Sequence, residues 1–158
     1  VRRLSESGPD RATHLWGKVA DDPQYQALAR FIWSQHLEPS PDDPPPEKVA
    51  KTRDEQIERA TAAVATLRAR GVKVLFVRMP SIGPFYAMEE KVLPRARTWD
   101  VLLQRTHAPG IHFMDYPQLQ NYQQPEWSHL SAPEARRFTT ALVPIVEQVF
   151  SKPTPQSR

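Results

Sequence analysis

The segment from residue 72 to residue 80 reads VKVLFVRMP, and it is the stretch that decides the fold class. Its valines, leucine and phenylalanine follow one another closely, whereas a strand with one solvated face would alternate apolar and polar residues. A run of this kind is typical of a strand buried on both faces, as in a parallel sheet covered by helices. We therefore predict such a strand from Val72 to Arg78.

Helical patterns precede this strand. From Pro23 onward, apolar residues recur at the spacing of one helical face for about three turns. A longer helix is predicted from Glu47 to Arg70, and Gly71 follows as its C-cap residue. Five prolines in the sequence EPSPDDPPPEK separate the two helices, so residues 38–46 should form an extended loop. We interpret this loop as a surface connector, with a proline-rich recognition motif as the alternative.

Further elements follow the strand. A loop leads into helical material with Trp99 on its inner side, and a second short strand is predicted from Ile111 to about Asp115. The last helix opens at Ser131, and Pro144 should kink it because proline removes one hydrogen bond of the helix. Alternation of helices and strands predicts an α/β fold with parallel strands and right-handed crossovers. Ligands of such folds meet the loops after the strands, here residues 79–86 and 115–129.

The length of 158 residues fits a single domain, 1–158. Residues 1–23 hold few apolar anchors and are predicted to be an irregular arm, and residues 151–158 an unstructured tail. The first residue is Val1 and not methionine, so we expect a processed chain or a fragment.

Composition excludes several classes of function. The 21 basic residues exceed the 18 acidic ones by only three and are dispersed, which argues against nucleic acid as a partner. Absence of cysteine excludes disulfides and thiolate chemistry. No apolar run approaches the roughly 20 residues of a membrane span, and no signal-peptide pattern opens the chain. The cellular compartment stays open.

An acid and a base stand before the last helix. Glu126 precedes His129 by three residues, and Ser131 with Glu134 has the spacing of a capping box. The positive end of the helix dipole should keep the imidazole neutral, as a general base requires. Glu126 is placed to fix its tautomer. The alternative is an ordinary loop histidine beside a solvated glutamate.

The segment PEWSHLSAPEARRFTTALV, residues 125–143, resembles the C-terminal signature of SGNH hydrolases, the GDSL-like esterase and acetyltransferase superfamily. Residues 72–86 and 110–119 are similar to late strands and loops of its bacterial members. The resemblance implies a three-layer, flavodoxin-like parallel sheet, with His129 as the catalytic base, no cofactor, and an ester or acylated carbohydrate as substrate.

Two departures from the family pattern matter. Glu126 stands where the family usually has aspartate, and Asp115 is a rival orienter of the histidine. No Gly-Asp-Ser segment, which carries the nucleophile in the family, is present. We therefore expect an architecture incomplete on its N-terminal side, whose strand 72–78 has an uncovered edge open to association.

Four more residues are candidates for substrate contact. Ser81 and Arg78 lie at the end of the first strand, and Tyr86 and Trp127 are aromatic residues in the two ligand-side loops. Their structural alternatives are a loop serine bonding its own backbone, an ion-pair partner and two packing residues. The remaining histidines lack metal-ligand spacing, so no metal site is predicted.

The sequence thus predicts the C-terminal part of an SGNH-type ester hydrolase or O-acyl-transferase-like protein. It would supply His129 and Glu126 but no recognisable nucleophile. The rival hypothesis is a non-catalytic α/β module that binds an anion or a protein partner at the mouth of the last helix.

Overall fold

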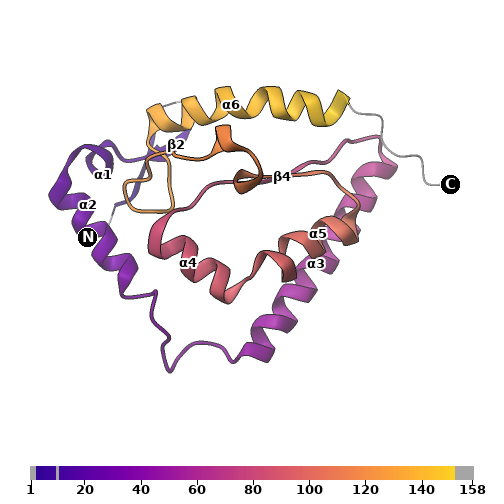
Figure 1. Ribbon diagram of the computed structural model, residues 1–158, viewed down its shortest axis with the longest axis horizontal. Coiled ribbons are helices and arrows are strands. Elements are labelled where there is room, and N and C mark those ends of the chain that lie inside the picture. Colours follow the sequence, from indigo (N-terminus) through magenta and orange to yellow (C-terminus); the bar gives the residue numbers. More distant parts are fainter. Residues whose placement is uncertain (1–2, 10, 152–158) are drawn as a thin grey trace.

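The computed structural model describes residues 3–9 and 11–151, and it has a mixed α/β fold in which helices dominate (Figure 1). The first part contains β1 (Ser5–Ser7), β2 (Thr13–Leu15), α1 (Gly17–Asp21), α2 (Pro23–Ser34) and α3 (Pro46–Ala69). The second part contains β3 (Phe76–Arg78), α4 (Gly83–Val92), α5 (Trp99–Thr106), β4 (Gly110–His112) and α6 (Ala132–Ser151), with 3₁₀ turns at Arg95–Arg97, Phe113–Asp115 and Pro117–Leu119. The predicted α/β class is confirmed.

The prediction of an irregular arm over residues 1–23 is wrong. Strands β1 and β2 pair antiparallel, and α1 follows them directly. Leu15 and Val19 are buried with Ala29 of α2 in a small apolar cluster, which gives the hairpin a surface to pack on. This cluster, with Leu4, Trp16 and Tyr25 packed against it, is enough to order the segment. Residues 1, 2 and 10 lie outside the described residues, as does the predicted tail beyond Ser151.

Helices α2 and α3 confirm the two predicted helices. The observed start of α2 and both observed ends of α3 lie within one residue of the predicted positions. Asp22 caps α2 by accepting from the amides of Gln24 and Tyr25. Gly71 follows α3 with φ of 77°, a left-handed conformation that glycine adopts without strain. The amide of Gly71 donates to Arg68, and the amide of Val72 to Leu67, which is the Schellman pattern of a helix end.

Strand β3 is shorter than predicted and is half-buried rather than buried. It pairs parallel with β4, as predicted, in a two-stranded sheet whose register sets Val77 beside Ile111 and Arg78 beside His112. Ile111 belongs to the main core, but Phe76, Arg78 and His112 line a cleft of about 960 Å³. The second face is therefore open, because α3, α4 and α5 form the walls of this cleft instead of covering the strand.

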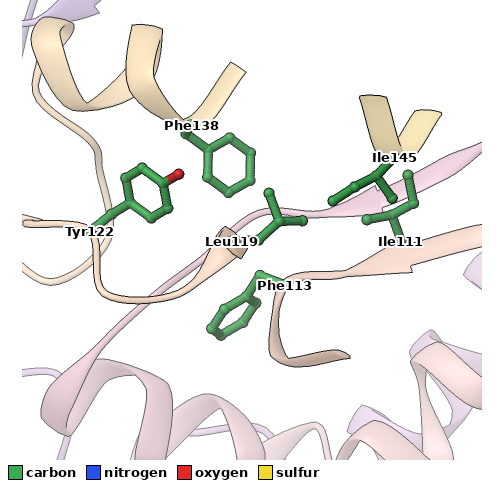
Figure 2. Packing of buried hydrophobic residues seen from close by; sticks show 6 residues of the cluster. All are labelled: Ile111, Phe113, Leu119, Tyr122, Phe138 and Ile145. Carbon is green, nitrogen blue, oxygen red and sulfur yellow. The ribbon is translucent and has the colours of Figure 1, made fainter. Parts of the chain in front are cut away.

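The main core lies between α6 and the segment that follows β4. Figure 2 shows Phe138 and Ile145 of α6 directed toward Leu119 and Ile111. The apolar face of α6 lies against this core, and the helix continues through Pro144 as one element. Burial of large apolar side chains contributes about 1.5–3 kcal/mol each, so this contact holds the start of α6 firmly in place.

Within the described residues, no helix combines the length and the apolar character that crossing a membrane requires.

Candidate functional site

The two loops that follow the strands, residues 79–86 and 115–129, contact each other. The side-chain amide of Gln124 donates to the carbonyl of Pro80 at 2.6 Å, and the amide of Ile82 donates to the carbonyl of Trp127 at 2.9 Å. Oε1 of Gln124 is buried without a hydrogen-bond partner among the described residues. These bonds fix the backbone on which the acid and the base stand.

Glu126 is fully buried, at 0% exposure, and both of its carboxylate oxygens are hydrogen-bonded. Oε1 accepts from the backbone amide of His129 at 2.6 Å and lies 2.9 Å from Nδ1 of the same residue. Oε2 accepts from the Ser128 hydroxyl at 2.7 Å and from the Trp33 indole at 2.6 Å. A buried carboxylate is costly unless such donors surround it, so this acid is held in one orientation.

His129 meets Glu126 with one ring nitrogen only. Nδ1 also lies 2.8 Å from the Ser128 hydroxyl, whereas Nε2 has no hydrogen-bond partner among the described residues. The side chain is 58% exposed. With Nδ1–H donating to the carboxylate, the neutral ring carries its lone pair on Nε2. The free nitrogen is then able to accept a proton from a bound reactant.

The two groups stabilise each other's charged forms. Burial by itself would raise the pKa of Glu126, but the hydrogen bonds from His129, Ser128 and Trp33 outweigh burial and hold this pKa below its ordinary value. The hydrogen bond from Glu126 raises the pKa of His129 above its ordinary value, against the opposing effect of burial. The ring is therefore a stronger base than a free imidazole.

This result corrects the expectation that the helix dipole controls the imidazole. His129 stands three positions before the first residue of α6, and the carboxylate partner determines the direction of its pKa shift. The capping-box prediction is also wrong. Glu134 accepts from the amide of Gln123 at 3.0 Å and from Arg137 at 2.9 Å, so its carboxylate ties the loop to α6 instead of closing back on Ser131.

Asp115 does not orient the histidine. It lies in a 3₁₀ turn and not in a strand, and Arg95 grips its carboxylate with two hydrogen bonds, of 2.7 and 2.9 Å. The hydrogen bonds from Arg95 hold the pKa of Asp115 below its ordinary value. The rival role predicted for Asp115 is therefore wrong, because its oxygens are occupied by a neighbouring guanidinium.

Ser81 and Arg78 belong to a separate cluster with Glu89. The Ser81 hydroxyl, which is 3% exposed, donates to the carboxylate of Glu89. Arg78 donates to the same carboxylate oxygen at 2.7 Å and to Ser81 at 3.3 Å. Arg78 also lines the cleft beside β3. Since the Ser81 hydroxyl pairs with Glu89, it is not activated by His129, and the cluster ties α4 to the end of β3.

Of the two aromatic candidates, Tyr86 is a packing residue and Trp127 belongs to the loop that carries the acid and the base. Tyr86 packs edge-to-face on Phe113 at 5.6 Å, and burial raises the pKa of its phenol. Trp127 stands between the acid and the base with φ of 75°, and the position that a Cβ of Gly83 would take is 3.5 Å from its ring. A side chain at residue 83 would thus touch the indole.

Sequence reasoning missed three residues of this site. Trp33 and Arg30 of α2 hold the loop from a distance of more than 90 positions in the chain: the Nε of Arg30 donates to the carbonyl of Pro125 at 2.7 Å. No local pattern signals such a pairing. Ser128 lies between Glu126 and His129 in the sequence, and its hydroxyl donates to the carboxylate of Glu126. A hydroxyl this close in sequence to the acid and the base was the one local signal for a further residue of the site.

The described residues contain no group of three or more histidine, aspartate or glutamate side chains placed to hold a metal ion. Comparison with protein-family models, curated proteins and solved structures finds no match to this chain.

Proposed function

We propose that this chain supplies the acid–base half of an SGNH-type ester hydrolase or O-acyl-transferase-like protein, with His129 as the catalytic base and Glu126 as its orienting acid. The supporting observation is a fully buried carboxylate 2.9 Å from Nδ1 of a histidine whose Nε2 has no partner among the described residues. Acid, base and a free nitrogen in this order are what activation of a hydroxyl nucleophile requires.

In this proposal, Nε2 of His129 takes the proton of a serine hydroxyl while the serine oxygen attacks an ester carbonyl. The imidazolium formed is stabilised by Glu126, and it returns the proton to the oxygen of the departing alcohol. Water or an acceptor alcohol then repeats the sequence on the acyl-enzyme. Substrates would be esters or acylated carbohydrates, and no cofactor is required.

The proposal takes the nucleophile from outside the described residues, because the sequence contains no Gly-Asp-Ser segment and Ser81 is buried and bonded to Glu89. The open cleft beside β3 is compatible with a larger, three-layer parallel sheet to which β3 and β4 contribute two strands. That larger architecture belongs to the proposal.

Hydrolysis of p-nitrophenyl acetate tests the proposal. The chain should show no activity above buffer, whereas a version extended by the coding sequence upstream of Val1 should hydrolyse the ester. His129→Ala should lower turnover of the extended protein by roughly 10³-fold or more. His14→Ala is the matched control, because His14 also faces a glutamate, Glu6 at 3.3 Å, on the exposed hairpin.

Activity of the extended protein that ignores His129→Ala would reject the catalytic role and favour the non-catalytic binding module. Activity of the short chain that vanishes with Ser81→Ala would instead make Ser81 the nucleophile.

A further inference from the structure

Arg30 is unusual among the arginines that the structure describes. Most of them either pair with a carboxylate, as Arg78 and Arg95 do, or are exposed. Arg30 is half-buried and has no carboxylate partner among the described residues. Withdrawing a cation from water without a counter-charge costs free energy, so a half-buried, unpaired guanidinium indicates a site that an anion completes.

The guanidinium of Arg30 is held in place from two sides. Its Nε donates to the carbonyl of Pro125 at 2.7 Å, and its Cζ stands 5.8 Å from the ring centroid of Trp127. These contacts use Nε and one face of the group. The two terminal nitrogens, which form the fork that binds a carboxylate in bidentate fashion, have no hydrogen-bond partner among the described residues.

Arg30 contacts the loop that carries Glu126 and His129. Arg30 precedes Trp33 by three residues, so both side chains project from the same face of α2. Trp33 bonds Glu126, and Arg30 bonds Pro125, the residue just before it. The carboxylate that follows Pro125 in the sequence, Glu126, is already bonded to His129, Ser128 and Trp33 and is not bonded to Arg30. Arg30 is therefore a cation without a carboxylate partner among the described residues, bonded to the loop that carries Glu126 and His129.

We propose that Arg30 binds the carboxylate of the substrate, so that the His129 site takes anionic esters in preference to neutral ones. The inference rests on the proposed function, because it takes the bound anion to be the substrate. Binding of an anion at Arg30 is nevertheless measurable in this chain without any turnover.

Two esters of nearly the same shape provide the test. Monomethyl succinate carries an ester and a carboxylate, and dimethyl succinate is its neutral counterpart. Binding is followed by NMR through the Trp127 indole N–H and the Arg30 Nε–H signals at neutral pH. The chain should bind monomethyl succinate about tenfold more tightly than dimethyl succinate, since a hydrogen-bonded ion pair is worth about one order of magnitude in affinity. High salt should reduce this preference.

Arg30→Gln should abolish the preference for the anionic ester. Arg30→Lys keeps the charge but loses the forked guanidinium, so it should retain part of the preference for the anionic ester. Partial retention would show that the loss in Arg30→Gln does not come from a folding defect. Arg59→Gln is the matched control, because Arg59 is an exposed arginine of α3 and its replacement removes the same charge elsewhere.

Equal affinity for the two esters in the unmodified chain, or an equal loss of both in Arg30→Gln, would overturn the inference and leave Arg30 as a tether of the loop. His129→Ala should retain the preference for the anionic ester. A failure of the catalytic proposal is thereby distinguished from a failure at Arg30.

Discussion

The indole nitrogen of Trp33 lies 2.6 Å from Oε2 of Glu126, although 93 positions separate the two residues in the chain. The indole also packs edge-to-face on Phe85 of α4, with ring centroids 5.2 Å apart. Through these two contacts the Trp33 side chain of α2 links α4 to the loop before α6. The orientation of the acid therefore depends on a helix near the start of the chain.

Trp33→Phe should destabilise the protein by about 1.5–3 kcal/mol, because it removes a donor from a buried carboxylate while keeping an aromatic ring against Phe85. Urea unfolding measures this change. Trp16→Phe is the control, since Trp16 packs on Tyr25 and its indole nitrogen donates no hydrogen bond within the described residues. A loss for Trp33→Phe no larger than that of the control would show that the bond to Glu126 contributes little.

The stability of the protein should depend on pH through the Glu126–His129 pair. The pKa of His129 is raised on folding, so its contribution is complete below about 6.5 and is lost as pH rises through the folded-state pKa. The pKa of Glu126 is lowered, so its contribution is complete above about 4.3 and is lost as pH falls through the folded-state pKa. The pair should therefore stabilise the fold most between about pH 4.3 and 6.5.

An NMR titration of the His129 ring checks the coupling directly. Glu126→Gln should lower the pKa of His129 relative to the unmodified protein, because the carboxylate that stabilises the imidazolium is gone. Asp115→Asn should leave the His129 curve unchanged, since Asp115 is bonded to Arg95. The opposite pattern, a shift with Asp115→Asn alone, would restore Asp115 as the orienting acid.

Gly110→Ala should destabilise the protein by about 1–3 kcal/mol through overpacking. A Cβ at this position would lie 2.7 Å from atoms of both Leu103 and Trp99, and the Trp99 ring is itself packed on His112. Gly71→Ala is the comparison: a Cβ there meets nothing within 4 Å, and only the left-handed φ of 77° opposes it, at about 1–2 kcal/mol. Thermal or urea unfolding of both variants separates packing from backbone strain. A Gly110→Ala protein as stable as the original would mean that Leu103 and Trp99 rearrange freely.

Self-association should follow from the open face and edge of β3. Phe76 lies on the cleft side of a two-stranded sheet, and such edges pair readily with other chains. Sedimentation velocity should show larger species as concentration rises, and Phe76→Lys should suppress them. Phe31→Lys, at a site 60% exposed on α2, controls for general apolar stickiness. A monomer at all concentrations would contradict the prediction.

Local patterns in the sequence predicted most of the elements. Proline and glycine punctuation placed α2 and α3, and the spacing of Phe138 and Ile145 gave the buried face of α6. The acid and the base were also predicted, since Glu126 and His129 are only three positions apart and bond across one turn of the loop. Each of these features depends on residues close in sequence, whose geometry the chain itself limits.

Tertiary structure decided the rest. The apolar run at residues 72–80 gave the strand but not its surroundings: whether helices cover both faces depends on how α3, α4 and α5 pack, and they leave a cleft. Asp115 and Glu134 found partners in Arg95 and Gln123 that no spacing rule indicates. The sequence by itself determined the presence of an acid beside a base. Only the fold decided that Trp33 would bond the carboxylate of Glu126 and that Arg30 would bond the backbone carbonyl of Pro125, because buried acceptors take whichever donors the packing of distant helices brings within reach.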